Sequence, residues 1–207
     1  IEVLELSNGV RVQLWPNEAE PGRVAVRARF GSGRRAFTSE TAVYASLGEG
    51  ALIGSGLGEL GQEEIDRIST GRKLGFDFSI LNTVFQFDAQ TRKEDLTDQL
   101  YLFAAKLGMP RWDANPVIRE QAASRLAYES FITSPTGLLT RDLDFYLAGQ
   151  DPRYATPDPE AIADTTVEEF REVWEPLLKQ GPIEVLVYGE FDRAEAIDTL
   201  RKTFGAL

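Results

Sequence analysis

The segment Arg23-Val24-Ala25-Val26-Arg27-Ala28-Arg29-Phe30 decides the fold class of this chain. Its even-numbered residues are all apolar, whereas three of its four odd-numbered residues are arginines. Successive side chains of a β-strand point to opposite faces, so this alternation predicts a strand with one apolar and one charged face. Such a strand belongs to a sheet that packs against the core on one side only.

The other strand signals lie on both sides of this segment. Asn8-Gly9 separates two short alternating runs, and Asn-Gly favours a hairpin because both residues tolerate positive φ. Ile183–Tyr188 is apolar on both sides, which predicts a strand in the middle of the sheet. The predicted strands, besides residues 24–30, cover about residues 3–6, 10–14, 76–80, 85–87 and 183–188.

Apolar residues at helical spacing occupy most of the remaining chain. Ser39 is the expected N-cap of the first helix, which ends in the glycine-rich stretch 54–58. Thr166-x-x-Glu169 forms a capping box, and Pro176 is expected to end or kink the helix that follows. The proline-rich loop 151–159 is expected to lack regular structure. The predicted helices cover about residues 39–54, 60–71, 92–108, 116–131, 135–148, 166–176 and 192–204.

Together these elements predict one α+β domain over residues 1–207. Strands gather early, helices gather late, and one buried strand returns near the end. This order favours a single, mainly antiparallel but mixed sheet of about five or six strands with helices packed on one face. The aromatic residues of the predicted strands and of the helix after Thr166 are expected to lie in the core: Phe76, Phe78, Phe85, Phe87 and Trp174.

The composition excludes several kinds of chemistry. The 207 residues include no His and no Cys. The groups for Ser-His-Asp or Cys-His catalysis and for the usual zinc sites are therefore missing, and only oxygen-ligand metals remain possible. Asp and Glu number 33 against 22 Lys and Arg, which gives a net charge of −11. Such a surface repels nucleic acid and anionic membranes, so we expect neither as a partner.

Two patterns that resemble functional motifs are better explained as ordinary structure. Gly56-x-Gly58-x-x-Gly61 matches the dinucleotide fingerprint, but a helix precedes it and nearby glutamates would repel a pyrophosphate. It is interpreted as a flexible connection between helices. The carboxylate pairs Asp142 with Asp144 and Glu63 with Glu64 would point to different faces of a helix, as solvated surface residues do.

Arg23, Arg27 and Arg29, with Arg34 and Arg35 beyond them, form one local positive patch on an acidic chain. Guanidinium groups bind carboxylates well, so the patch is a candidate contact for a peptide or an acidic partner. The favoured alternative is a solvated outer face of the sheet or a contact with a neighbouring domain.

Read in order, six blocks of sequence resemble one half-domain of the pitrilysin/insulinase family, the zinc peptidases with an inverted H-x-x-E-H motif that include the mitochondrial processing peptidases. The resemblance extends over essentially the whole chain. The blocks are Leu6-Ser7-Asn8-Gly9-Val10-Arg11-Val12, Ser55-Gly56-Leu57-Gly58, residues 106–113 (KLGMPRWD), Asp151-Pro152-Arg153-Tyr154, residues 185–192 (VLVYGEFD) and Phe204-Gly205-Ala206-Leu207.

The resemblance implies that the zinc motif is degenerate here. In an active domain of this family, two His and a distant Glu hold the metal and the motif Glu activates water. In the implied register, Ser46 and Gly50 replace the two His, and Glu49 retains the motif position. A lone carboxylate does not hold Zn²⁺, so the resemblance implies no cofactor in this chain. Zinc is expected only in the catalytic domain of the parent or partner protein.

By the same resemblance, the chain is similar to the first domain of the C-terminal half of a bacterial member. It would be an inactive, non-catalytic domain of a larger multidomain peptidase, walling a closed chamber around peptide substrates beside the catalytic half of the same enzyme. A periplasmic or otherwise exported location is implied, with the bacterial cytoplasm as the alternative. Other readings are a partner subunit of a heterodimeric peptidase, a non-proteolytic subunit like the core proteins of respiratory complexes, and an independent peptide-binding module that uses a sheet edge.

Overall fold

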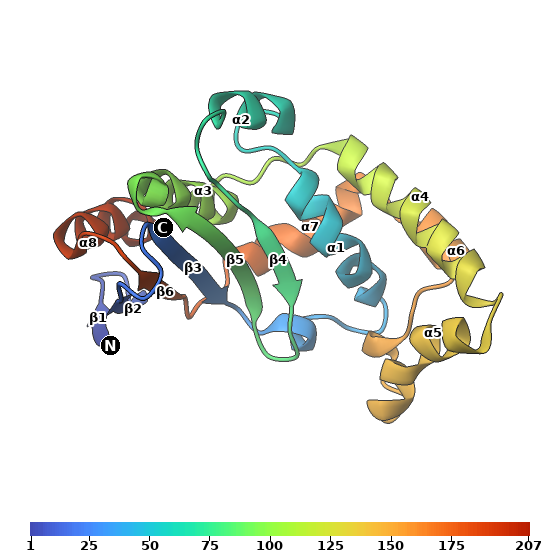
Figure 1. Cartoon of the computed structure of the whole chain (residues 1–207). Coiled ribbons are helices and arrows are strands. Elements are labelled where there is room, and N and C mark those ends of the chain that lie inside the picture. The colour runs from blue at the N-terminus through green and yellow to red at the C-terminus, as the bar shows by residue number, and fades with distance from the viewer.

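A six-stranded sheet forms the centre of the computed structural model, which describes all residues from Ile1 to Leu207 (Figure 1). Its spatial order is β1-β2-β6-β3-β5-β4, and every neighbouring pair is antiparallel except β2 with β6. The mixed, mainly antiparallel sheet is therefore confirmed, with β6 in its middle and β1 and β4 at its edges. The strands are β1 (Glu2–Glu5), β2 (Arg11–Pro16), β3 (Arg23–Phe30), β4 (Asp77–Ile80), β5 (Phe85–Arg92) and β6 (Glu184–Gly189).

Eight α-helices accompany the sheet. Helix α3 packs on β3 and β5 with α8 beside it, and α1 lies against the edge strand β4. Helices α4, α5 and α6 extend beyond α1, away from the sheet (Figure 1). The helices are α1 (Ala42–Gly54), α2 (Gln62–Ile68), α3 (Leu96–Gly108), α4 (Ala114–Phe131), α5 (Pro135–Leu147), α6 (Pro159–Ala163), α7 (Val167–Leu178) and α8 (Arg193–Lys202).

The core lies between the sheet and these helices. The apolar side chains of β3 are all buried, as the alternation predicts. Aromatic rings from β4, β5, α3 and α7 meet beneath them, with Trp174 and Phe85 centroids 5.4 Å apart. Edge-to-face and tilted ring contacts of this kind add to the burial of apolar area. The predicted core role of the aromatic residues is confirmed, Phe76 being half-buried at its margin.

Local signals correctly placed the starts of two late helices. Thr166 Oγ1 accepts a hydrogen bond from the backbone N–H of Glu169 at 3.2 Å at the start of α7. Asp192 accepts one from Glu195 N at 2.8 Å at the start of α8. Each side chain satisfies a backbone donor that has no partner within its helix.

Other boundaries differ from the predictions. Helix α1 begins at Ala42 after Thr41, not after Ser39, because Thr41 Oγ1 accepts a hydrogen bond from Thr38 N at 2.9 Å and keeps the preceding residues in a loop. Leu60 is not part of α2 but pairs with Leu57 in an isolated bridge. Phe204 is buried in a short 3-10 turn beyond the end of α8.

Three prolines of the second half also behave differently from expectation. Pro176 does not end α7, which continues to Leu178. Residues 151–159 are not wholly irregular: Pro152 opens a short 3-10 turn and Pro159 opens α6. Proline lacks an N–H and its fixed φ suits the first turn of a helix, where no partner is required, so a Pro-rich stretch starts two short helices here.

Candidate functional site

The helix that the resemblance identifies as the zinc helix is α1, and neither motif position on it carries a metal ligand. Ser46 is exposed, and its Oγ donates a hydrogen bond to Val43 O at 2.7 Å within the same helix. Gly50, one turn further, has no side chain. No group of three or more Asp or Glu side chains in the chain is arranged to hold a metal ion. Ser46 is thus bonded within its own helix, and Gly50 adds no donor atom.

Glu49, the remaining motif residue, is used to hold the sheet. Its Oε1 accepts a hydrogen bond from the backbone N–H of Ile80 at 2.8 Å. Ile80 is the last residue of β4, an edge strand. A backbone N–H on the outer side of an edge strand has no strand partner, and this carboxylate supplies an acceptor. Glu49 thus joins α1 to the sheet.

Trp174 of α7 fills the space beneath α1. Its side chain is fully buried, and Nε1 donates a hydrogen bond to Tyr44 O at 2.9 Å. A Cβ placed on Gly48 would lie 2.1 Å from Trp174 Cζ2. The close approach of the indole therefore requires glycine at position 48. The packing of Trp174 against Gly48 holds α1 against α7.

Glu120 of α4 fills the space beside Gly50. A Cβ placed on Gly50 would lie 2.1 Å from the carboxyl carbon of Glu120. Sequence reasoning did not identify Glu120 or Trp174 as neighbours of the motif helix. The only local signal is the pair of glycines at 48 and 50 within a helix, which indicates close approach but not the residue that approaches.

Lys106 of α3 closes the end of α1. Its Nζ donates hydrogen bonds to Leu52 O at 3.0 Å and Ser55 O at 2.6 Å, and it lies 4.5 Å from the centre of the Phe76 ring. The last carbonyls of a helix have no partner within it, and a lysine satisfies them here. Burial lowers the pKa of Lys106 to about 8, partly opposed by the charge of Asp113.

The glycine-rich stretch after α1 is an ordered connection to α2. Gly56 N donates a hydrogen bond to Asp113 Oδ2 at 3.0 Å, and Gly58 N donates one to Met109 O at 2.9 Å. A Cβ on Gly56 would lie 2.0 Å from Leu60 O. The glycine at 56 therefore serves a tight turn that packs against the end of α3.

The candidate carboxylate pairs lie on the surface of their helices. Asp142 pairs with Arg141 at 2.7 Å, and this guanidinium holds the pKa of Asp142 below its usual value. Glu63 and Glu64 are exposed in the first turn of α2, where negative charge complements the helix dipole.

The arginines of β3 lie on the open face of the sheet, opposite the core. Arg27 Nε lies 2.6 Å from Asp88 Oδ1, and Arg29 Nε donates to Gln86 Oε1 at 2.8 Å. Arg23 contacts Glu20 and Gln90. The three guanidinium groups are thus held by neighbours along β5 and the loop before β3, and Arg29 alone of them has no carboxylate partner.

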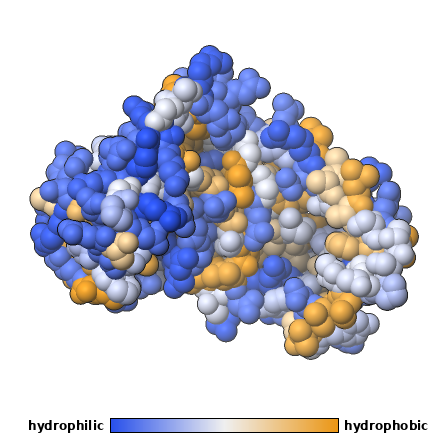
Figure 2. Space-filling view, in the orientation of Figure 1, coloured by the Kyte–Doolittle hydropathy of each residue, from blue (hydrophilic) through white to orange (hydrophobic).

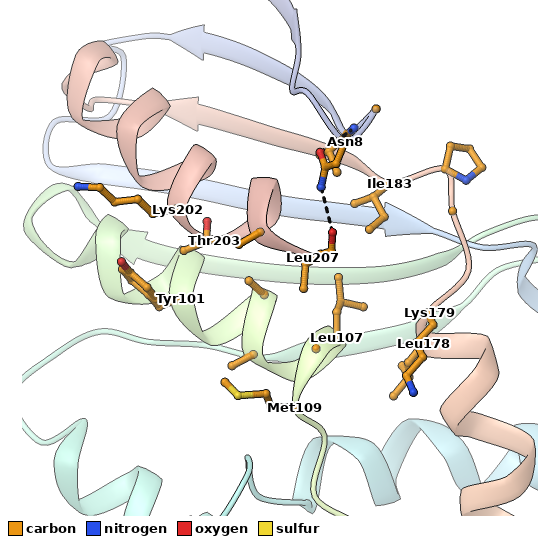
Figure 3. A pocket seen from close by; sticks show the side chains of 18 residues that line it. Asn8, Tyr101, Leu107, Met109, Leu178, Lys179, Ile183, Lys202, Thr203 and Leu207 are labelled. Atoms are coloured by element: carbon orange, nitrogen blue, oxygen red, sulfur yellow. Dashed lines mark hydrogen bonds between the residues drawn. The ribbon is translucent and has the colours of Figure 1, made fainter.

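An apolar cleft of about 680 Å³ lies between the start of β2, the end of α3 and the last residues of the chain. Figure 3 shows Leu107, Met109 and Ile183 among its lining residues, with Asn8 donating a hydrogen bond to Leu207 O at 3.3 Å. Its two lysines, Lys179 and Lys202, are paired with Glu175 and Asp198 one helical turn earlier. The cleft therefore offers mainly apolar contact, and both of its lysines are already held in ion pairs.

Comparison with solved structures identifies this architecture. A protease from Helicobacter pylori matches the whole chain with a TM-score of 0.79 at 20% identity, and the match covers 50% of that protein. The inactive domain of an M16 peptidase from Pseudomonas fluorescens matches with a TM-score of 0.75 at 17% identity, again over 50% of that chain. The periplasmic protease PqqL from Escherichia coli matches with a TM-score of 0.78 at 14% identity, over 24% of its length.

These likenesses show that the chain has the α+β half-domain fold that is found in these peptidases. The register of the zinc motif on α1, with Ser46 and Gly50 at the two ligand positions, remains what the sequence resemblance implies. The chain spans half or less of the neighbouring proteins described above. No family model and no curated protein matches the sequence. None of the helices is long and apolar enough to cross a bilayer.

Proposed function

We propose that this chain is a non-catalytic domain of a pitrilysin-type zinc metalloendopeptidase, and that it forms part of the wall of a closed proteolytic chamber. The proposal rests on which residues α1 carries at the three zinc-motif positions and on how this helix is packed. Ser46 and Gly50 replace the two ligands, and Trp174 packs tightly beneath the helix. Glu49 is bonded to the sheet. A peptidase domain arranged in this way shapes a cavity and does no hydrolysis itself.

The open face of the sheet supports the chamber role. Its side chains on β2, β3 and β6 are exposed or half-buried. Ion pairs join neighbouring strands across it, Arg11 with Glu184 and Arg27 with Asp88, whereas Arg29 and Asp77 have no ion-pair partner. A chamber wall needs such a surface, because it stays hydrated when empty and still offers hydrogen bonds to an extended peptide. Arg23, Arg27 and Arg29 belong to this face, and we propose them as contacts for the peptide or for the facing half of the enzyme.

The partner that follows from this proposal is the catalytic half of the same peptidase, in the same chain or in a separate subunit. The neighbouring proteins are two to four times longer than the matched region, which leaves room for such a half. Peptide substrates would reach this domain only through the assembled enzyme. An exported, periplasmic location is part of the proposal, and PqqL, a protein of this fold, is periplasmic.

Zinc binding tests the proposal directly. We expect the purified chain, after treatment with a chelator, to bind no stoichiometric Zn²⁺ by isothermal titration calorimetry and to cleave no peptide. A Ser46→His/Gly50→His variant, which offers two imidazoles one helical turn apart beside Glu120, checks that the assay detects a zinc site on this helix. Tight stoichiometric Zn²⁺ binding by the unaltered chain, or chelator-sensitive cleavage by it alone, would overturn the assignment.

A further inference from the structure

The open face of the sheet is organised in rows that run across the strands. Strand register places Trp15 of β2, Tyr188 of β6, Ala25 of β3 and Gln90 of β5 side by side in one row. The next row contains Gln13, Leu186, Arg27, Asp88 and Asp77. Residues opposite one another on the same face are close enough to interact, so each row acts as a continuous strip.

A trough of about 840 Å³ crosses these two rows. It exists because Ala25, between Tyr188 and Gln90, is the smallest side chain of its row, and because Gly75 beyond β5 adds no side chain at all. The trough extends from Trp15 at one end to Asp77 at the other.

The Trp15 end of the trough carries an aromatic wall. The rings of Trp15 and Tyr188 pack edge to face with centroids 5.2 Å apart. Asn17 Nδ2 donates a hydrogen bond to the Tyr188 hydroxyl at 3.1 Å, which helps to fix that ring. Trp15 is nevertheless 44% exposed. An ordered aromatic pair with an exposed indole face suits an apolar or aromatic side chain of a bound peptide.

The Asp77 end carries unbalanced negative charge. Asp77 and Asp88 stand directly opposite in the β4–β5 register, and like charges in that position repel. Arg27 pairs with Asp88 at 2.6 Å, whereas Asp77 has neither an ion pair nor a hydrogen bond through its side chain. A cation bound at Asp77 would offset the repulsion between the two carboxylates and neutralise the Asp77 charge, which Arg27 does not pair.

The distance between the two ends fixes the size of the ligand. Four strand spacings of about 4.8 Å separate β2 from β4, or roughly 19 Å. An extended chain spans this distance with about five or six residues.

We propose that the trough binds an extended peptide segment lying across the strands, with an apolar or aromatic side chain against Trp15 and Tyr188 and a lysine or arginine side chain at Asp77. The inference deepens the proposed chamber function and rests on it for the source of the peptide. It names the class of segment that this wall selects, one with an apolar and a basic residue about five positions apart.

Binding of short capped peptides to the 207-residue chain tests the inference. The probe is a hexapeptide with Phe at one end, Lys at the other and Gly and Ser between them, made in both directions. Tryptophan fluorescence, to which the exposed Trp15 contributes beside Trp112 and Trp174, and amide chemical shifts report binding. In at least one direction we expect the Lys peptide to bind at least fivefold more tightly than its norleucine counterpart, with a preference that weakens as salt rises.

Variants separate the two ends of the trough. Asp77→Asn is expected to remove the preference for Lys and leave norleucine binding unchanged, and Trp15→Ala is expected to weaken the Phe peptide at least fivefold. Glu5→Gln, an exposed carboxylate at the far edge of the same sheet, is the matched control and should change nothing. No binding by the unaltered chain, or equal binding of Lys and norleucine peptides, overturns the inference. The proposed chamber role is judged separately, by zinc binding and cleavage.

Discussion

The contact of α1 with α7 and the arm made by α4 and α5 are opposite kinds of apolar surface. Beneath α1, Trp174 is fully buried and approaches Gly48 so closely that no Cβ fits. Helix α5, in contrast, has no buried residue, and Figure 2 shows apolar side chains gathered over it and over α4. The first surface is satisfied within the chain. The second is the kind of exposed apolar patch that marks a contact with another protein surface.

Removing Trp174 from the buried contact should change the free energy of unfolding more than any other substitution considered below. Trp174→Ala creates a cavity under α1 and removes the hydrogen bond to Tyr44 O. We expect the free energy of unfolding to fall by about 3–5 kcal/mol, the usual range for a buried large aromatic residue. Urea titration followed by circular dichroism measures the change. A loss below about 1 kcal/mol would mean that α1 is not held by this packing.

The pH dependence of stability tests the other anchor of α1, Lys106. Its pKa is lowered to about 8 by burial, from an ordinary value of 10.5. Between these values the unfolded chain binds more protons than the folded chain, so the free energy of unfolding should rise with pH, by at most about 3 kcal/mol over the whole window. Below pH 8 this lysine contributes no slope.

Between pH 8 and pH 10, the contribution of Lys106 to the pH dependence of the free energy of unfolding is separated from that of Tyr44. Burial, followed by the hydrogen bond to Glu169, raises the pKa of Tyr44 to about 12, so this tyrosine lowers stability only as pH rises above its unfolded value of 10. Lys106→Met should be less stable, because carbonyls of α1 lose their donor, and should lose the upward slope. Urea midpoints at several pH values measure both. A slope unchanged in the variant would assign it to another group.

Glu49 provides a smaller effect in the same region. Glu49→Ala leaves the Ile80 N–H at the β4 edge without its acceptor, and we expect a loss of about 1 kcal/mol and faster hydrogen exchange at Ile80. Glu49→Gln keeps an acceptor oxygen and should preserve most of the protection. Equal exchange in all three proteins would show that the carboxylate has no role at the edge.

The sequence predicted what depends on local pattern and missed what depends on distant packing. The alternation of Arg23–Phe30 and the caps at Thr166 and Asp192 were read correctly because each acts within a few residues. The edge strands, the Gly48–Trp174 contact and the Gly50–Glu120 contact join segments far apart in the chain. No periodicity encodes such pairs. The degenerate motif positions were visible in the sequence, but the residues that fill the space around them were not.

Substitutions on the exposed arm of α4 and α5 should change the free energy of unfolding least, in contrast to those at the buried contact of α1 with α7. Leu139 and Leu147 of α5 are 57% and 75% exposed. Leu139→Gln and Leu147→Gln keep good helix formers and remove little buried area, so each should change the free energy of unfolding by less than about 0.5 kcal/mol. If either variant lost 2 kcal/mol or more, the arm would be packed within the isolated chain. If the partner proposed above covers α5, the same variants should weaken its binding while leaving the fold intact, because apolar area contributes to stability only where it is removed from water. Light scattering with the catalytic half, compared with urea titration of the chain alone, separates these two effects.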